Sequence, residues 1–127
     1  MKLKDWLTRK LYVTSPRDPD PFFHPRRYAE KKEVVLEAAH RVLAGLKSWR
    51  VEEYRENQGR IHASHFGPFP LPFQDVNLYV VQALDGTSKL EATSSSRAGR
   101  GDLGQNRRNL KKFLTRMDAL LPPKREG

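Results

Sequence analysis

The sequence predicts an α+β fold: a two-layer sandwich in which a four-stranded antiparallel sheet is covered on one face by two helices, with an N-terminal arm. Three observations predict it. Two long segments have apolar residues at spacings of three and four, the helical period, and they flank four short segments of alternating apolar and polar residues. Glycine-containing turns join the alternating segments in two successive pairs, as β-hairpins require. The predicted order is therefore α-β-β-β-β-α.

The chain divides into an arm and linker over residues 1–27, a single α+β domain over residues 28–122 and a tail over residues 123–127. A chain of 127 residues is long enough for one hydrophobic core. The absence of cysteine excludes a disulfide scaffold, a thiol nucleophile and a thiolate metal site. No apolar run is long enough to span a membrane and no secretory signal is visible, so we expect a cytoplasmic protein.

The arm begins with a basic amphipathic pattern between Lys2 and Leu11. Two interpretations are open: peripheral contact with a membrane surface or a partner, or packing of the arm on its own domain, which we favour. The linker that follows has four prolines within residues 16–25, and these disfavour regular hydrogen-bonded structure. We expect Phe22 and Phe23 to anchor the linker to the core.

The first helix is predicted over residues 28–46, where valine, leucine and alanine recur at helical spacing. The first hairpin follows, with strands over residues 49–56 and 60–66. Its turn is Asn57-Gln58-Gly59, in which Gly59 would supply a positive φ.

The second hairpin is predicted from strands over residues 75–84 and 88–95, joined at Asp85-Gly86, a strong signal for a short turn. The second helix is predicted over residues 102–121, because an apolar stripe runs through it and Pro122-Pro123 ends it.

The most informative stretch covers residues 94–108, where a loop with two glycines leads into the second helix. Asp102 suits the N-cap position, and Gln105 three residues later completes a capping box. A loop that enters a helix start offers backbone N–H groups and the positive end of the helix dipole, and the planar fork of arginine suits phosphate or carboxylate. We therefore predict an anion pocket. Its candidate residues are Arg97, Gly99, Arg100, Gly101, Asn106, Arg107 and Arg108.

The same motif allows a structural interpretation, a clasp that locks a strand to the helix. In that case Arg107 pairs with Asp75 or Asp102, and Asn106 bonds the loop backbone. The stretch matches neither a Walker loop nor a dinucleotide-binding fingerprint, because no Gly-Lys-Ser/Thr follows and the glycine spacing differs.

The stretch from Ser96 to Arg107 reads Ser-Arg-Ala-Gly-Arg-Gly-Asp-Leu-Gly-Gln-Asn-Arg. It resembles the signature of the domain of unknown function 1499 family, Ser-Arg-x-Gly-x-x-Asp-Leu-Gly-x-Asn-Arg. Phe73-Gln74-Asp75-Val76 is similar to the Asp-Asp-Val strand start of that family, with Gln74 in place of the first acid. The resemblance extends over about residues 12–121. It implies no known activity, because the family is uncharacterised.

The net charge of +9 is concentrated at the two ends of the chain. Residues 1–28 contain 7 basic and 3 acidic side chains, and residues 94–127 contain 9 and 3. Such a field favours an anionic partner, which could be nucleic acid, a phosphorylated ligand or an acidic protein. A solvated, solubilising surface is the alternative interpretation.

Enzymatic chemistry has little support in the sequence. His62 and His65 are three residues apart, so they point to opposite faces of a strand and do not jointly bind a metal ion. We expect no metal and no cofactor, and we assign no catalytic residue. A hydrolase-like enzyme would use His62 or His65 with Asp75 and Arg107, and a register that places these side chains on different faces would exclude it. We predict a non-enzymatic binding module, with the hydrolase and a purely structural or protein-interaction domain as alternatives.

Overall fold

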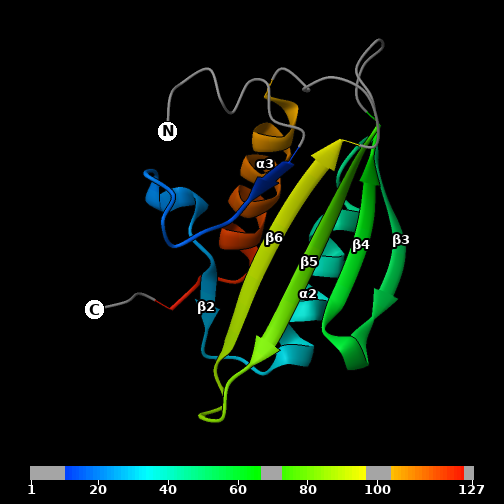
Figure 1. The fold of residues 1–127 in the computed structure, drawn as a ribbon. Helices are drawn as coiled ribbons and strands as arrows, with labels where there is room; N and C mark the ends of the chain where they lie inside the picture. The colour runs from blue at the N-terminus through cyan, green and yellow to red at the C-terminus, as the bar shows by residue number, and fades with distance from the viewer. Residues whose placement is uncertain (1–10, 67–72, 97–103, 125–127) are drawn as a thin grey trace.

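The computed structural model describes residues 11–66, 73–96 and 104–124 of the chain. Figure 1 shows one sheet with both helices packed against it. In chain order the elements are β1 (Leu11–Val13), the 3-10 turn η1 (Pro21–Phe23), β2 (Arg26–Tyr28), α2 (Lys32–Ala44), β3 (Trp49–Arg55), the 3-10 turn η2 (Glu56–Gln58), β4 (Arg60–His65), β5 (Gln74–Gln82), β6 (Ser88–Ser96) and α3 (Gln105–Leu120).

Within the described residues the sheet has six strands, all paired antiparallel, in the order β1-β6-β5-β4-β3, and β2 also pairs with β6. The α+β class and both predicted hairpins are confirmed. The predicted count of four strands is wrong, because β1 and β2 come from the segment assigned to the arm and linker. Each has only three residues, which is too short to show an alternating pattern.

β1 and β2 lie end to end along β6, with a proline-containing excursion between them. β1 pairs with the later part of β6, where Leu11 lies opposite Ser95, and β2 pairs with the earlier part. At the break, the Thr14 hydroxyl accepts a hydrogen bond of 3.0 Å from the backbone N–H of Ala92, so the side chain replaces a ladder partner. The excursion places Phe23 in the core, where it is 1% exposed, as the sequence predicted.

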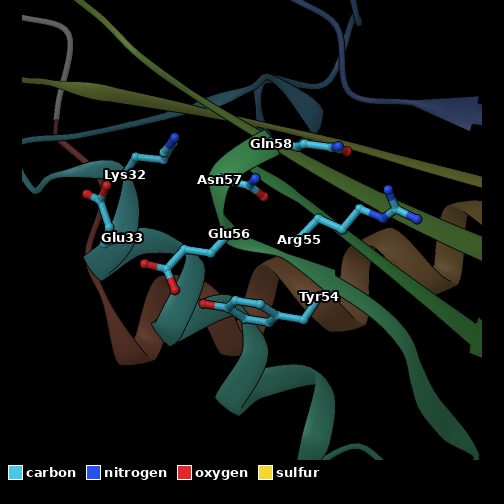
Figure 2. A pocket seen from close by; sticks show the side chains of 7 residues that line it. All are labelled: Lys32, Glu33, Tyr54, Arg55, Glu56, Asn57 and Gln58. Carbon is cyan, nitrogen blue, oxygen red and sulfur yellow. The ribbon is translucent and has the colours of Figure 1, made fainter.

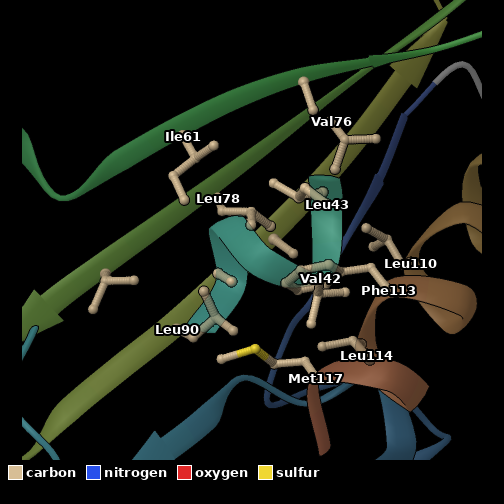
Figure 3. Packing of buried hydrophobic residues seen from close by; sticks show 14 of the residues in the cluster. Val42, Leu43, Ile61, Val76, Leu78, Leu90, Leu110, Phe113, Leu114 and Met117 are labelled. Atoms are coloured by element: carbon tan, nitrogen blue, oxygen red, sulfur yellow. The ribbon is translucent and has the colours of Figure 1, made fainter. Parts of the chain in front are cut away.

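The core lies between the sheet and the two helices. Ile61, Ala63, Val76 and Leu78 alternate along their strands and are fully buried against the helix layer, which shows that both helices cover the same face (Figures 1 and 3). The buried residues of α2 are Val35, Leu36, Ala39, Val42 and Leu43. Those of α3 are Asn106, Asn109, Leu110, Phe113, Leu114 and Met117.

The first helix begins at Lys32 and not at Tyr28 as predicted. Tyr28 is instead the last residue of β2, and its side chain is fully buried. The backbone of Lys31 is extended, which ends the preceding strand segment before the helical turn begins.

The turn between β3 and β4 needs glycine for two reasons. Gly59 has φ 64°, in the left-handed region, as predicted. Its backbone also lies against β5: the Val80 N–H donates to the Gly59 carbonyl at 2.7 Å, and a Cβ on Gly59 would lie 2.2 Å from the Val80 carbonyl oxygen. Any side chain at this position would therefore push β5 away from the turn.

Candidate functional site

The helix that follows the predicted motif starts later than expected. α3 begins at Gln105, and its N-cap is Gly104, which has φ 84° and no side chain to cap the helix. The predicted N-cap at residue 102 is therefore wrong, because the N-cap is Gly104; Asp102 itself lies outside the described residues. The Gln105 side chain donates from Nε2 to Asn109 Oδ1 at 2.8 Å instead.

Five predicted site residues lie outside the part of the chain that the structure describes, namely Arg97, Gly99, Arg100, Gly101 and Asp102. The arm between Lys2 and Leu11 also lies outside it, apart from Leu11 itself. Asn106, Arg107, Arg108 and Asp75 are described, and the structure gives them different surroundings.

Asn106 faces the sheet and is 2% exposed. Its Oδ1 accepts a hydrogen bond of 2.7 Å from the Ser94 hydroxyl, and its Nδ2 donates to the Ser96 hydroxyl at 3.2 Å. Both serines lie on β6, the strand that leads into the motif. Asn106 therefore ties the first turn of α3 to the end of β6 through serine side chains. The predicted bond of Asn106 to the loop backbone concerns residues outside the described part of the chain.

The hydrogen bonds of Asn106 continue into a larger buried group. Asn109, one turn further along α3, donates from Nδ2 to the Ser94 hydroxyl at 3.3 Å and to Gln74 Oε1 at 3.4 Å. Gln74 Oε1 also lies 2.7 Å from His65 Nδ1. We call this group the polar clasp; its members are His65, Gln74, Ser94, Asn106 and Asn109, all at most 8% exposed.

Sequence reasoning missed Gln74 and Asn109, although a signal for both was present. Gln74 is in phase with the inward residues of β5, and Asn109 is on the apolar stripe of α3. A polar side chain at an inward position needs a buried partner, because an unsatisfied buried amide costs about 1–3 kcal/mol. Polar residues that interrupt two apolar stripes would therefore have pointed to a buried contact between the strand and the helix.

His65 has a fixed proton position in the polar clasp. An amide oxygen only accepts hydrogen bonds, so the contact with Gln74 Oε1 requires the proton on His65 Nδ1. Burial lowers the pKa of His65; the hydrogen bond to Gln74 acts in the opposite direction, and the positive charge of Lys112 adds to the lowering. Burial therefore favours the neutral form of this histidine, which has a structural role in the clasp.

Arg107 contacts the excursion between β1 and β2. Its Nη2 lies 3.4 Å from Asp20 Oδ2, and its guanidinium carbon lies 4.4 Å from the centre of the Phe23 ring. The predicted pairing of Arg107 with Asp75 is wrong, since Asp75 projects from the opposite face of the sheet and pairs with His62. The alternative partner Asp102 lies outside the described residues.

A second ion pair joins β2, the strand that follows the excursion, to the other end of α3. Arg26 is 7% exposed and binds Asp118 through two bonds of 3.0 Å, from Nε and Nη2. Its Nη1 donates to the carbonyl groups of Phe22 and His24. The sequence offered no signal for this pair, because its members are far apart in the chain and each looks like a surface residue.

Arg108 is the predicted anion ligand that lies at the surface. Its side chain is exposed and donates to Gln105 Oε1 at 3.1 Å. Arg107 and Arg108 lie in the first turn of α3, near the positive end of the helix dipole. No acidic residue occurs in that turn to offset their charge.

His62 and Asp75 form a pair on the uncovered face of the sheet. His62 Nε2 lies 2.8 Å from Asp75 Oδ1, and the two side chains are 23% and 25% exposed. His65 and Arg107 lie on the other side, with the helices. The structure therefore does not assemble the predicted hydrolase combination of histidine, Asp75 and Arg107.

An open cavity of about 760 Å³ lies away from all of these residues, between the start of α2 and the turn of the first hairpin (Figure 2). Its lining is Lys32, Glu33, Tyr54, Arg55, Glu56, Asn57 and Gln58. Basic and acidic side chains alternate around it, so it favours neither sign of charge, and no predicted site residue contributes to it.

Within the described ranges, no group of three or more histidine or acidic side chains is placed to hold a metal ion. The helices in those ranges are too short or too polar to cross a membrane.

One solved structure shows that the fold is shared, and a second aligns with a lower TM-score. The X-ray structure of a Chromobacterium violaceum protein aligns with a TM-score of 0.51 at 13% identity, covering 91% of this chain and 99% of that chain. The solution NMR structure of a Thermobifida fusca protein aligns with a TM-score of 0.47 at 16% identity, covering 82% and 97%. No curated protein matches the sequence.

The family resemblance seen in the motif is confirmed over nearly the whole chain. The model of the family described as "Protein of unknown function (DUF1499)" matches residues 3–117. The match includes both hairpins, the polar clasp and nearly all of α3. The chain therefore belongs to the DUF1499 family of proteins of unknown function.

Proposed function

We propose that the protein is a non-enzymatic binding module that holds an anionic group at the N-terminal end of α3. The observation that carries the proposal is the first turn of this helix, which follows an N-cap glycine, has two arginines and has no acidic residue. Cations near the positive end of a helix dipole destabilise the helix, so folding alone disfavours them there. An anion bound at this end would be stabilised by both the dipole and the arginines.

The polar clasp supports this proposal by fixing the geometry of the helix start. Asn106 and Asn109 hold the first two turns of α3 against β6 through buried hydrogen bonds. A site whose scaffold is rigid loses less entropy on binding. Asn106 is thus an orienting residue, and Arg108 is the described side chain that reaches the ligand from the surface.

Arg107 has a different role from Arg108 in this proposal. Its contacts with Asp20 and Phe23 fix the guanidinium beside the helix start, and its side chain is 27% exposed. Arg107 therefore contributes a positive charge at a fixed position beside the proposed anion site. Arg97, Gly99, Arg100 and Gly101 remain candidate ligands on sequence grounds, because the loop they belong to leads into this helix end.

The test is a titration of the full chain with pyrophosphate, followed by backbone NMR shifts. We expect saturable shifts centred on residues 104–108 and at least tenfold weaker binding by the Arg100→Ala/Arg108→Ala variant, whose melting temperature should stay nearly unchanged. An Arg41→Ala/Arg55→Ala variant removes the same charge from the surfaces of α2 and β3 and should bind as the natural chain does. Equal weakening in both variants would show general electrostatics in place of a site.

A hydrolytic function is the second candidate, and one observation favours it. The contact between His62 and Asp75 has the geometry of a general base with its orienting carboxylate, and both side chains reach solvent. The neighbouring Ser64 is fully buried and donates to Glu52 at 2.6 Å, so it does not serve as the nucleophile. Hydrolysis of p-nitrophenyl esters and phosphates by the natural chain, abolished by His62→Gln, would support this function; equal rates would contradict it.

A further inference from the structure

The outer face of α3 has a row of basic side chains that neither the fold nor the proposed anion site uses in full. Arg108, Lys111, Lys112 and Arg116 are all exposed, and we call them the basic stripe. At 1.5 Å per residue, the stripe extends about 12 Å along the helix axis. Thr115, which lies among them on the same face, is also exposed and uncharged.

Three of the four residues of the basic stripe have no acidic partner in the described part of the chain. Among the described residues, no carboxylate lies within ion-pair distance of Lys111, Lys112 or Arg116. The one acidic residue of α3, Asp118, is bound by Arg26. The stripe therefore presents concentrated positive charge to solvent.

The spacing within α3 makes this charge unfavourable for the helix itself. Arg108 and Lys112 are four residues apart, as are Lys112 and Arg116, so like charges face each other along the surface. Such pairs destabilise a helix, and Lys112 also disfavours protonation of His65 in the polar clasp. Lys111, Lys112 and Arg116 add like charge to the helix and pair with no carboxylate among the described residues, so an external anionic partner would explain them.

We infer that the basic stripe binds the phosphate backbone of double-stranded nucleic acid, independently of base sequence. This inference rests on the proposed function, because it extends the anion site at the start of α3 along the whole helix. Each strand of a duplex presents one phosphate about every 3.4 Å of axis, so the roughly 12 Å stripe would face three or four phosphates. Four cations on a straight helix match that regular row of charge.

The surroundings of the stripe favour a duplex over a single strand. Proteins that bind single strands combine basic grooves with aromatic side chains on which bases stack. The aromatic residue of α3, Phe113, is fully buried in the core. The basic stripe therefore offers contacts to phosphate and none to a base face.

The same burial argues against a membrane surface. A helix that lies in a lipid interface inserts its apolar face between the headgroups. The apolar face of α3 is occupied by the sheet and α2 of its own domain, and Figure 3 shows Leu110, Phe113 and Met117 within this core. Only charge would remain for membrane binding, whereas a duplex offers a rigid row of phosphates that matches the stripe in length.

The test measures binding of the full chain to a labelled 20-base-pair duplex by fluorescence anisotropy across a salt series. With four phosphate contacts, log K should fall with log salt at a slope near −3.6, so Kd should rise roughly 100-fold between 50 and 200 mM salt. The Lys111→Gln/Lys112→Gln/Arg116→Gln variant should bind at least tenfold more weakly at 50 mM salt, with a slope reduced by about 3.

A matched control separates the stripe from net charge. Lys31→Gln/Arg41→Gln/Lys47→Gln removes three exposed cations of the α2 side of the molecule and lowers net charge equally. We expect it to keep the affinity and slope of the natural chain to within about twofold. Equal loss in both triple variants would overturn the inference, and so would tighter binding to phosphatidylserine vesicles or to poly-glutamate than to the duplex at 150 mM salt.

The pyrophosphate titration distinguishes the two proposals. The stripe variant keeps Arg108, so pyrophosphate should still bind at residues 104–108 of that variant. Pyrophosphate binding by the natural chain without duplex binding would overturn this inference alone. Failure of the natural chain to bind either ligand would overturn both proposals.

Discussion

The two helices cover the same face of one sheet, yet they are built differently. α2 packs against the sheet with apolar side chains, and its exposed face pairs opposite charges, as in the Glu37–Arg41 contact of 3.2 Å. α3 adds two buried asparagines to its packing face and has five basic residues against one acidic residue. The comparison shows that covering the sheet does not require the polar clasp or the basic stripe, so these features of α3 need a separate explanation.

The largest effect expected from this comparison concerns the ion pairs of the two helices. Arg26→Ala should lower the free energy of unfolding by about 3 kcal/mol, because it leaves Asp118 and two backbone carbonyl groups without their buried partner. Arg41→Ala breaks the exposed pair of α2 and should cost less than about 0.5 kcal/mol. Urea unfolding of both variants checks this, and similar losses would show that burial does not separate the two pairs.

The polar clasp should give the next largest effect. Asn109→Ala removes one partner each from Gln74 and Ser94 in a buried setting and should cost about 1–3 kcal/mol. Lys111→Ala, on the exposed face of the same helix, should change stability by less than about 0.5 kcal/mol. Chemical denaturation would contradict the role of the clasp if the two variants were equally stable.

Neutralising one surface charge in each helix should have a smaller effect. The free energy of unfolding should rise for the α3 variant and fall for the α2 variant. Lys112→Gln removes two like-charge pairs from α3 and should raise the free energy of unfolding by about 0.5 kcal/mol. Glu37→Gln removes an opposite-charge pair from α2 and should lower it by about 0.3 kcal/mol. Thermal unfolding at low salt measures both, and the differences should shrink at 1 M salt.

The smallest effect is a pH dependence that arises from the polar clasp. The pKa of His65 is lowered by burial in the folded chain, whereas the unfolded chain has the ordinary value near 6.5. The unfolded state therefore binds more protons just below pH 6.5. The free energy of unfolding should therefore be unaffected by His65 above that pH, and it should fall as the pH drops towards the pKa of His65 in the folded chain. Urea unfolding at pH 7.5 and 5.5 should show a smaller drop in His65→Gln, and an identical drop would exclude His65 as the cause.

The elements with regular local patterns could be predicted from the sequence. The two hairpins follow from alternation and from glycine turns, and Gly59 has the expected positive φ. β1 and β2 could not be predicted, because three-residue strands show no period and exist only through pairing with β6. The N-cap at Gly104 was missed because the sequence pattern placed the cap at Asp102, whereas Gly104 adopts a left-handed backbone that glycine alone takes readily.

The candidate site was predictable in part. The identity of Asn106 as a motif residue was visible in the sequence, but its partners on β6 follow only from the register of strand and helix. The contact of Arg107 with Asp20 joins residues that no local pattern connects. Long-range polar pairs of this kind follow only from the tertiary structure. The row of basic residues on α3, in contrast, follows from their helical spacing in the sequence.

The division of one sheet edge into β1 and β2 has a consequence for behaviour at high concentration. An uninterrupted edge strand exposes a row of N–H and C=O groups that can recruit another chain and start aggregation. Here the edge beside β6 is cut into two three-residue pieces by a proline-containing excursion, and Thr14 fills the gap with its side chain. The opposite edge, β3, has a register shift between Val51 and Glu53, and four of its seven residues are charged. In the described part of the chain, neither edge offers a straight template of useful length, which protects these edges against strand addition by incoming copies.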